Sequence, residues 1–449
     1  MKTIKVIGGG LAGSEAAWQI ANTGIQVELF EMRPHLQTGA HQTDNLAELI
    51  CSNSLGSKLF DRASGVLKNE LNQLGSLLLR IAEETSLPAG SALAVDRKLF
   101  SEMVTQEILN HPNIHVIRRE FTSIPDEMAI ISTGPLTSST FSNSISQFCG
   151  QANLYFFDAI SPIILKDSIN MNIAYRLSRR AEESETDGDY INCPFHDKKD
   201  YLNFVNALKS AERITLKYFE EEILNGVNAG PDLFFEGCLP VEIIAERGEK
   251  SLAFGPLRPV GLKDPLFERQ PYAVVQLRQD NLAGNLFNMV GFQTNLTFPE
   301  QKRIFRMIPG LEDAEFARFG QMHRNTFIAS PKLLLPTLQS ANRPDLFFAG
   351  QLTGVEGYLG NIGTGLVAGL NASRIMNGRE PLVLPKETML GSLVNYITHV
   401  ELKHFQPMKA NFGILPALDN LDQKSTKKER ALQYSIRSKK YIDSFMKNT

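Results

Sequence analysis

The stretch that decides the fold is residues 5–31, KVIGGGLAGSEAAWQIANTGIQVELFE. A short apolar strand ends in a G-x-G-x-x-G pattern, a helix follows, and a second strand over residues 27–30 ends at Glu31. Such glycines allow a tight turn, a close approach of the backbone to a pyrophosphate, and close packing of the helix on the strand. The N–H groups and dipole of the helix N-terminus attract the phosphates. A lone glycine pattern also occurs in ordinary turns, but here all the parts follow in register, which predicts a dinucleotide site.

The expected cofactor contacts come from three separate stretches of the chain. In the first stretch the glycine-rich turn surrounds the pyrophosphate, and the acid at the end of the second strand accepts hydrogen bonds from a ribose. The second stretch is AIISTGP, residues 129–135, and the third is FFAGQ, where a strand ends before a helix that we expect from about Ile362. The expected cofactor-binding residues are Gly8, Gly9, Gly10, Leu11, Ala12, Gly13, Glu31, Gly134, Gly350 and Gln351.

Composition limits the class of protein. The chain has 449 residues, of which 43% are hydrophobic and 21% charged, and this predicts two or three globular domains. The net charge of −3 gives no global attraction to nucleic acid, so any nucleic-acid site must be a local basic patch. No apolar run approaches the roughly 18 residues that a membrane helix needs. We therefore expect a cytoplasmic protein without a membrane span.

Four cysteines are present, and their spacing argues against a metal centre. They are Cys51, Cys149, Cys193 and Cys238. No C-x-x-C motif and no Cys/His cluster with zinc spacing occurs, so we expect free thiols and no bound metal. Most free cysteines are buried and inert. Cys149 and Cys193 have no motif around them and are expected to be structural.

The pattern along the chain predicts an α/β protein. After Glu31 we expect a long loop with a helix from about Leu46, then one amphipathic helix over residues 65–84. A helix at 96–110 and a strand at 114–118 complete the first part. Further along we expect a helix from Lys198 to about Leu224, short strands between residues 231 and 296, and a helical stretch over 299–320.

This order of elements indicates a discontinuous Rossmann-like dinucleotide-binding domain with an inserted mixed α+β domain. The expected ranges are 1–165 for the first part, 166–324 for the inserted substrate domain, and 325–449 for the second part. The last segment, residues 424–449, holds eight Lys/Arg and two Asp/Glu, a balance of +6. Such a run is usually a solvated helix face, and it also suits contact with phosphates.

Several distant motifs together resemble one family. They are GGGLAGSEAA, LICSNSLGSK, FFEGCLPVE, MHRNTFI, AGQLTGVEGYLGNI and HFQPMKANFGILP. The chain resembles the folate- and FAD-dependent tRNA (uracil-5-)-methyltransferases over essentially its full length. The glycine-rich motifs alone also fit a sister family, the GidA-type wobble-uridine modification proteins. One departure is Gly56, which stands where a basic residue is expected in many members, so no phosphate contact is expected from that position.

The resemblance implies an activity and its cofactors. The carbon of 5,10-methylenetetrahydrofolate would pass to C5 of the uridine at position 54 in the T loop of tRNA. The hydride would come from FAD that NADH or NADPH has reduced. A paralogous branch that modifies ribosomal RNA is similar in sequence, and a small-molecule flavin oxidoreductase or a flavin-dependent partner of the GidA type remains an alternative. The oligomeric state is not readable from the sequence.

The residue types suit this chemistry. C5 of uracil is a poor nucleophile, and a thiolate that adds at C6 converts the ring into an enolate that attacks an electrophilic carbon. Cys238 and Cys51 stand in the two cysteine motifs and are the expected catalytic residues. The candidate folate-binding residues, which equally suit a structural turn, are His323, Arg324 and Asn325. The candidate RNA-binding residues are Arg176, Arg179, Arg180, Lys427, Lys428, Lys439 and Lys440.

Overall fold

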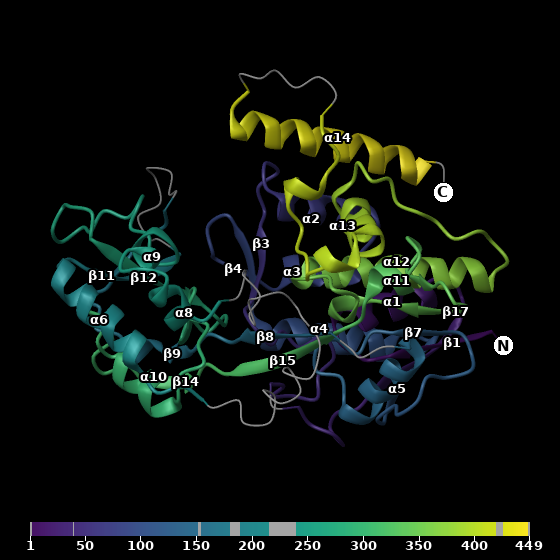
Figure 1. Cartoon of the computed structure of the whole chain (residues 1–449), viewed down its shortest axis with the longest axis horizontal. Coiled ribbons are helices and arrows are strands. Elements are labelled where there is room, and N and C mark those ends of the chain that lie inside the picture. The colour runs from purple at the N-terminus through teal and green to yellow at the C-terminus, as the bar shows by residue number, and fades with distance from the viewer. Residues whose placement is uncertain are drawn as a thin grey trace.

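The computed structural model describes residues 2–38, 40–150, 154–179, 189–214, 239–418 and 425–447, and of residues 154–159 and 322–325 it describes the backbone. The chain forms two bodies that an antiparallel two-stranded ribbon connects (Figure 1). The ribbon consists of β8 (Leu154–Ala159) and β15 (Met322–Phe327). The chain therefore enters the second body through β8 and leaves it through β15.

The first body contains a mainly parallel sheet in the order β16-β17-β7-β1-β2-β6. Its strands are β1 (Thr3–Ile7), β2 (Gln26–Glu31), β6 (Ile114–Arg118), β7 (Ala129–Ile131), β16 (Gln339–Ser340) and β17 (Arg343–Phe348). All neighbouring pairs are parallel except the edge pair β16-β17. The stretches that the sequence assigned to the dinucleotide site thus lie on adjacent strands, although more than two hundred residues separate β7 from β17.

Two helices cover this sheet in direct contact with each other, α1 (Leu11–Ala21) and α12 (Tyr358–Met376) (Figure 1). Glycine makes this approach possible. A Cβ at Gly365 would lie 2.2 Å from the carbonyl oxygen of Ala12, and one at Gly369 would lie 2.7 Å from that of Ala16. Both distances are below any real contact, so the two backbones can approach this closely only because both positions lack side chains.

Two sequence predictions fail in the segment after β2. The predicted single helix over 65–84 is two helices, α2 (Ala63–Gln73) and α3 (Leu77–Glu84). Gly75 has φ +76°, and the Ser76 hydroxyl accepts the Leu79 N–H as an N-cap, so a new helix begins. The predicted helix from about Leu46 is wrong as well, because the chain there is a loop in which Ala47 has φ +52°. The loop leads into a small antiparallel sheet of β3 (Ser54–Ser57), β5 (Ala92–Val95) and β4 (Ser86–Leu87).

The predicted helix over residues 96–110 is confirmed as α4 (Arg97–Asn110), which the Asp96 carboxylate caps. This body also contains α5 (Ser139–Cys149), before the chain crosses to the second body, and α11 (Ser330–Leu333) and α13 (Met389–His399), after it returns. The last helix predicted from the glycine-rich block begins at Tyr358 rather than near Ile362.

The second body is built on a six-stranded antiparallel sheet in the order β10-β11-β12-β13-β9-β14. Its strands are β9 (Ile163–Leu165), β10 (Tyr175–Arg176), β11 (Tyr190–Phe195), β12 (Ala273–Gln279), β13 (Leu286–Met289) and β14 (Phe316–Arg318). Helices α6 (Lys198–Ser210), α8 (Val241–Glu246), α9 (Ser251–Phe254) and α10 (Phe298–Phe305) belong to this body.

Three predictions for this body need correction. The helix from Lys198 ends at Ser210, well before Leu224. The stretches at 241–246 and 251–254, predicted as strands, are helices, because their apolar residues pack as helix faces into the core of this body. The stretch 299–320 is helical only to Phe305 and ends in β14.

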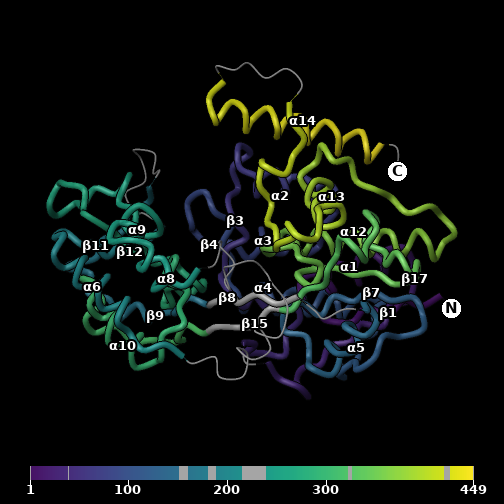
Figure 2. The backbone as a smooth tube through the Cα atoms, viewed as in Figure 1, coloured from purple at the N-terminus to yellow at the C-terminus, as the bar shows by residue number. Residues whose placement is uncertain are grey.

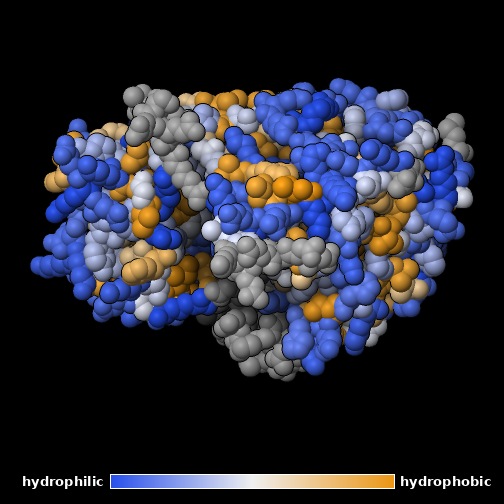
Figure 3. Space-filling model, turned by 90° about the horizontal axis from the view of Figure 1, so that it is seen from above, coloured by the Kyte–Doolittle hydropathy of each residue, from blue (hydrophilic) through white to orange (hydrophobic). Residues whose placement is uncertain are grey.

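The basic C-terminal segment forms α14 (Lys427–Lys447), which lies across α2 (Figure 2). The Ser435 hydroxyl donates to the Phe60 carbonyl, and the Ser438 hydroxyl donates to the buried carboxylate of Glu70. Its outer side carries exposed apolar residues as well as lysines, including Ile436 at 57% exposure. Figure 3 views the molecule from the side on which α14 lies, and this face is mainly hydrophilic with small apolar patches. Among the described residues, no helix has the length and apolar character needed to cross a membrane.

Candidate functional site

A pocket lies where the carboxyl ends of β1, β2, β7 and β17 meet, the edge at which open parallel sheets bind ligands. It brings together predicted residues from all three stretches of the nucleotide site. Those that line it are Gly8, Gly10, Leu11, Ala12, Glu31, Gly134, Gly350 and Gln351, together with the candidate catalytic Cys51. Gly9 and Gly13 lie behind this lining and support it.

The glycines of the first loop have distinct roles. Gly8 has φ +107°, and a Cβ there would lie 2.6 Å from the Ser132 carbonyl oxygen of the neighbouring strand end. A Cβ at Gly13 would lie 1.8 Å from the Gly8 carbonyl oxygen, so this position must be glycine for the helix to pack on the strand. Gly10 differs from both, because a Cβ there would meet no protein atom within 4 Å and would project into the pocket. The loop therefore keeps free space where a pyrophosphate is expected.

Glu31 is buried and held by an ion pair with Arg33 that sequence reasoning missed. The Arg33 Nε donates to Glu31 Oε1 at 2.9 Å, and the Gly9 N–H donates to Glu31 Oε2 at 3.1 Å. Burial by itself would raise the pKa of Glu31, but the hydrogen bonds and charge of Arg33 outweigh it and lower the pKa. Glu31 is therefore an ionised acceptor fixed at the end of β2.

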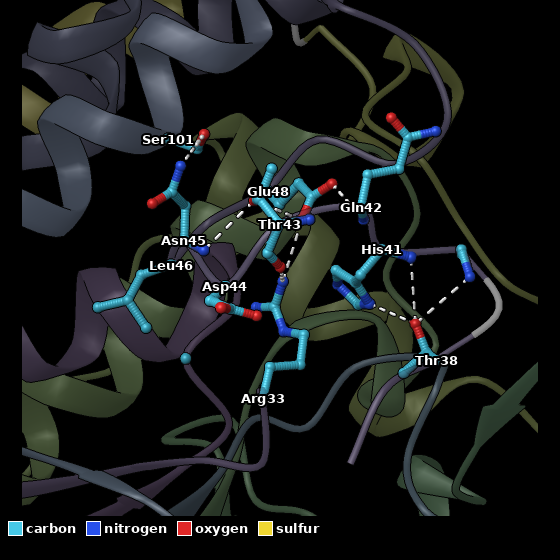
Figure 4. Close-up of polar contacts among 12 residues, drawn as sticks. Arg33, Thr38, His41, Gln42, Thr43, Asp44, Asn45, Leu46, Glu48 and Ser101 are labelled. Carbon is cyan, nitrogen blue, oxygen red and sulfur yellow. Dashed lines mark hydrogen bonds and ion pairs between the residues drawn. The ribbon is translucent and has the colours of Figure 1, made fainter. Parts of the chain in front are cut away.

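The loop after β2 is closed by a second carboxylate. Glu48 Oε1 accepts the Gln42 N–H, and Glu48 Oε2 accepts both the N–H and the hydroxyl of Thr43. Arg33 Nη1 reaches the same carboxylate at 3.1 Å and the Thr43 carbonyl at 3.0 Å, so Arg33 joins the strand end to the loop (Figure 4). The sequence feature that could have identified this pair is the presence of two opposite charges, Arg33 and Glu48, in the long loop directly after β2.

Cys51 lies in the pocket wall on a rigid main chain. Its N–H donates to the Tyr358 hydroxyl at 2.9 Å, and the Ser52 N–H donates to the same oxygen at 3.0 Å. Burial raises the pKa of Tyr358, so this phenol is neutral. Because Tyr358 begins α12, the cysteine loop is tied to the helix that also approaches Gly350. The sequence prediction placed Cys51 on a helix, whereas it lies in a loop before β3.

Asn361 is a further pocket residue that the sequence analysis did not single out. It lies in the first turn of α12, is 8% exposed and lines the pocket. Its Oδ1 has no hydrogen-bond partner among the described residues. A buried amide oxygen without a partner is costly, which indicates a ligand donor at this place. The sequence feature that could have identified Asn361 is the glycine-rich start of α12. The sequence analysis placed the start of this helix about one turn too late.

The other predicted site residues are only partly described. Cys238 and Arg180 lie outside the described residues. His323, Arg324 and Asn325 lie on β15, where the backbone pairs with β8 and the side chains are not described. The structure therefore locates the candidate folate residues on the ribbon that connects the two bodies.

The predicted RNA-binding residues lie on both bodies. Arg176 stacks over the Phe287 ring at 5.9 Å, and Arg179 donates through Nε to Gln276 Oε1 at 2.7 Å, so both are engaged within the second body. The four predicted lysines are exposed on α14, and one of them, Lys439, pairs with Asp443. They are Lys427, Lys428, Lys439 and Lys440.

The two remaining described cysteines are poor nucleophiles. Cys193 is fully buried in β11, and burial raises its pKa far above the usual range. Burial also raises the pKa of Cys149, at the end of α5, to about 12. Across the part of the chain that the structure describes, no group of three or more His, Cys, Asp or Glu residues could hold a metal ion.

Comparison with known proteins defines the class first. The family model "Glucose inhibited division protein A" matches residues 3–380. Two crystal forms of Aquifex aeolicus GidA have the same fold, with TM-scores of 0.68 and 0.65 at 16% and 17% identity. They cover 98% of this chain and 73% and 76% of those chains. The chain therefore belongs to the family that this model describes, and it has the fold of GidA.

Closer relatives narrow this class. Proteins named methylenetetrahydrofolate–tRNA-(uracil-5-)-methyltransferase TrmFO from Lactobacillus gasseri and Enterococcus faecalis are each 52% identical to this chain, over 446 and 429 residues. These matches cover 99% and 96% of this chain and 98% and 95% of the relatives. The chain belongs to the TrmFO family, as the sequence motifs predicted.

Proposed function

We propose that this protein forms 5-methyluridine in tRNA, at position 54 of the T loop. The carbon would come from 5,10-methylenetetrahydrofolate and the hydride from FAD reduced by NADH or NADPH. The observation that carries the proposal is that Cys51 lies in the wall of the same pocket as the dinucleotide-binding glycines, in a chain of the TrmFO family. A small-molecule oxidoreductase would not need a cysteine there.

The pocket suits FAD by its shape and its polar groups. Open space at Gly10 leaves room for a pyrophosphate, and Glu31 offers an ionised acceptor for ribose hydroxyls. The unpartnered Asn361 Oδ1 also belongs to the lining and lies beside Gly350. When bound, the flavin supplies the hydride chemistry. No second G-x-G-x-x-G pattern marks a nicotinamide domain, so the reductant would reach the flavin face directly.

The roles of the two cysteines follow from the chemistry of uracil. A thiolate that forms a bond to C6 moves electron density to C5 and O4, and C5 then attacks the one-carbon unit. Loss of the C5 proton with release of tetrahydrofolate would leave a methylene carbon on C5, and a hydride added to that carbon would expel the thiolate from C6 and give the methyl group. We assign the addition to Cys238 and place Cys51 beside the flavin, where its main chain is fixed by Tyr358.

The substrates would approach from the outer surfaces. His323, Arg324 and Asn325 on β15 are the candidate contacts for the folate. Local basic residues must bind the RNA, because the net charge of −3 gives no global attraction. The exposed lysines of α14 and the arginines near β10 are the candidates. A target base stacked in a folded loop must also be swung out, at a cost of about a few kcal/mol that phosphate contacts offset.

The decisive experiment is methyl transfer to a tRNA transcript from methylenetetrahydrofolate without S-adenosylmethionine. We expect 5-methyluridine at one position of the T loop and none in a ribosomal-RNA fragment. Cys51→Ala should abolish transfer, while the matched control Cys149→Ala keeps activity within a few-fold. Transfer to the ribosomal fragment alone would favour the paralogous activity. Flavin binding without transfer to either RNA would favour a partner role of the GidA type.

A further inference from the structure

The loop that carries Cys51 is held by both bodies of the molecule. Asn53 is fully buried and lies two residues after Cys51. Its Nδ2 donates to the Val95 carbonyl of the first body at 3.0 Å and to the Gln279 carbonyl of the second at 2.9 Å. Its Oδ1 accepts from Nε of Arg278 in the second body at 2.8 Å. One buried amide therefore makes three hydrogen bonds, one within the first body and two across the interface to the second body.

A second set of contacts holds the residue just before Cys51. The Ile50 carbonyl accepts from Arg97 Nη1 at 3.2 Å and from Arg318 Nη2 of the second body at 3.1 Å. Arg97 is in turn fixed by Asp280 of the second body, which lies 3.0 Å from its Nε and Nη2. Two guanidinium groups thus converge on one carbonyl, and both depend on groups of the second body.

These contacts are more specific than domain packing requires. Asp280 is 4% exposed and Arg278 8%, and burying charges costs free energy unless each has well-placed partners. An apolar interface of the same area would join the two bodies without that cost. The polar groups here converge on residues 49–53. On the pocket side of the same loop, Tyr358 holds the N–H groups of Cys51 and Ser52.

We propose that Asn53, Arg278 and Arg318 are positioning residues for Cys51, so that docking of the second body sets the geometry of the cysteine in the flavin pocket. This inference rests on the proposed function for its catalytic consequence. The second body, which carries candidate RNA contacts, is thereby coupled to the pocket of the first body through five residues of main chain. None of the three side chains lines the pocket, and each acts on Cys51 through the loop.

Three variants and one matched control test the proposal. Arg318→Ala removes the contact to the Ile50 carbonyl, and Arg318→Lys keeps one donor. Asn53→Asp keeps the shape but replaces a donor to two carbonyls by an acceptor. The control is Arg303→Ala, which removes an exposed arginine of the same body that pairs with Glu300 away from the interface. Measurements are amide hydrogen exchange of the segment 49–53, kcat and KM for tRNA methylation, and bound flavin per chain.

We expect amide exchange of this segment to rise about tenfold or more in Arg318→Ala and in Asn53→Asp, because buried hydrogen bonds are lost. A displaced cysteine should lower kcat by about tenfold to a hundredfold. Flavin content and the KM for tRNA should stay within about twofold, and Arg318→Lys should recover much of kcat. Arg303→Ala should change none of these quantities.

Three results would overturn the proposal. The first is faster amide exchange of residues 49–53 in Arg318→Ala or Asn53→Asp with an unchanged kcat. The second is a reduced kcat in these variants with unchanged amide exchange. The third is a change of the same size in Arg303→Ala. If Asn53→Asp fails to fold, the comparison of Arg318→Ala with Arg318→Lys tests the proposal. A parent protein without any methyl transfer would contradict the proposed function instead, and the exchange measurement would still show whether the second body holds the loop.

Discussion

The glycine loop 8–13 and the loop 33–53 face the same pocket, but they are fixed by different forces. The first is fixed by steric exclusion over a few residues, since Gly13 fits only because it has no Cβ. The second has no regular structure and is fixed by polar contacts with distant parts of the chain, among them Arg97, Arg318 and Tyr358. A local steric rule can be read from a motif, whereas a set of long-range polar contacts cannot.

The largest expected effect is in the glycine loop. Gly13→Val places side-chain atoms where a Cβ alone is already 1.8 Å from the Gly8 carbonyl oxygen. We expect a loss of stability of more than about 3 kcal/mol, because α1 must move away from β1. Thermal unfolding followed by circular dichroism measures it. A variant with parental Tm and bound flavin would contradict the steric account.

A slightly smaller effect is expected in the polar loop. Arg33→Met leaves the buried carboxylates of Glu31 and Glu48 without their shared cation, which should cost about 3 kcal/mol. Denaturant unfolding measures the loss, and proteolysis should cut within residues 34–48 first. The matched control is Arg80→Met, whose exposed pairs should contribute less than about 1 kcal/mol. Equal losses in the two variants would show that burial of the Arg33 pair is unimportant.

The third effect concerns a buried carboxylate that holds a segment distant in the sequence. Glu70 accepts the N–H groups of Met389 and Leu390 at the start of α13 and the Ser438 hydroxyl of α14. Burial raises the pKa of Glu70 to about 7. The folded state therefore binds this proton more tightly than the unfolded state. Its stabilising contribution is complete below the ordinary glutamate pKa of 4.5 and is lost as the pH rises through about 7.

We therefore expect the free energy of unfolding to fall by about 1 to 3 kcal/mol from this group between pH of about 4.5 and 7. Other buried groups also titrate, so the comparison is with Glu70→Gln, which resembles the protonated form at every pH. The free energy of unfolding of the parent minus that of Glu70→Gln should fall by this amount over the same pH range. A pH-independent difference would mean that Glu70 has an ordinary pKa in the folded protein.

The smallest effect on stability is expected at Gly10, in the same loop as Gly13. Gly10→Val meets no protein atom with its Cβ, so the free energy of unfolding without ligand should change by less than about 0.5 kcal/mol. The side chain occupies the space expected for a pyrophosphate, so the purified variant should be folded and colourless. Stoichiometric flavin in this variant would contradict the proposal that the pocket holds the pyrophosphate of FAD next to Gly10.

Much of the nucleotide-binding body was predictable from the sequence. The strands, the glycine turn and the acid at residue 31 follow from periodicity and backbone sterics, which act over short distances. The errors came where local signals are ambiguous. The helices at 241–246 and 251–254 look like strand segments because short apolar runs fit either structure, and packing in the second body decides between them.

The sequence by itself determined the fold class and membership in the TrmFO family, because both can be read from short motifs and from the order of the elements along the chain. It also predicted three stretches that line one pocket in the structure. Only the tertiary structure decided that Arg33 pairs with Glu31 and Glu48, that Tyr358 and Arg318 hold the Cys51 loop, and that Asn361 faces the pocket. These side chains meet across up to 307 positions in sequence. No spacing rule connects residues so far apart, because their contact depends on how strands and domains pack.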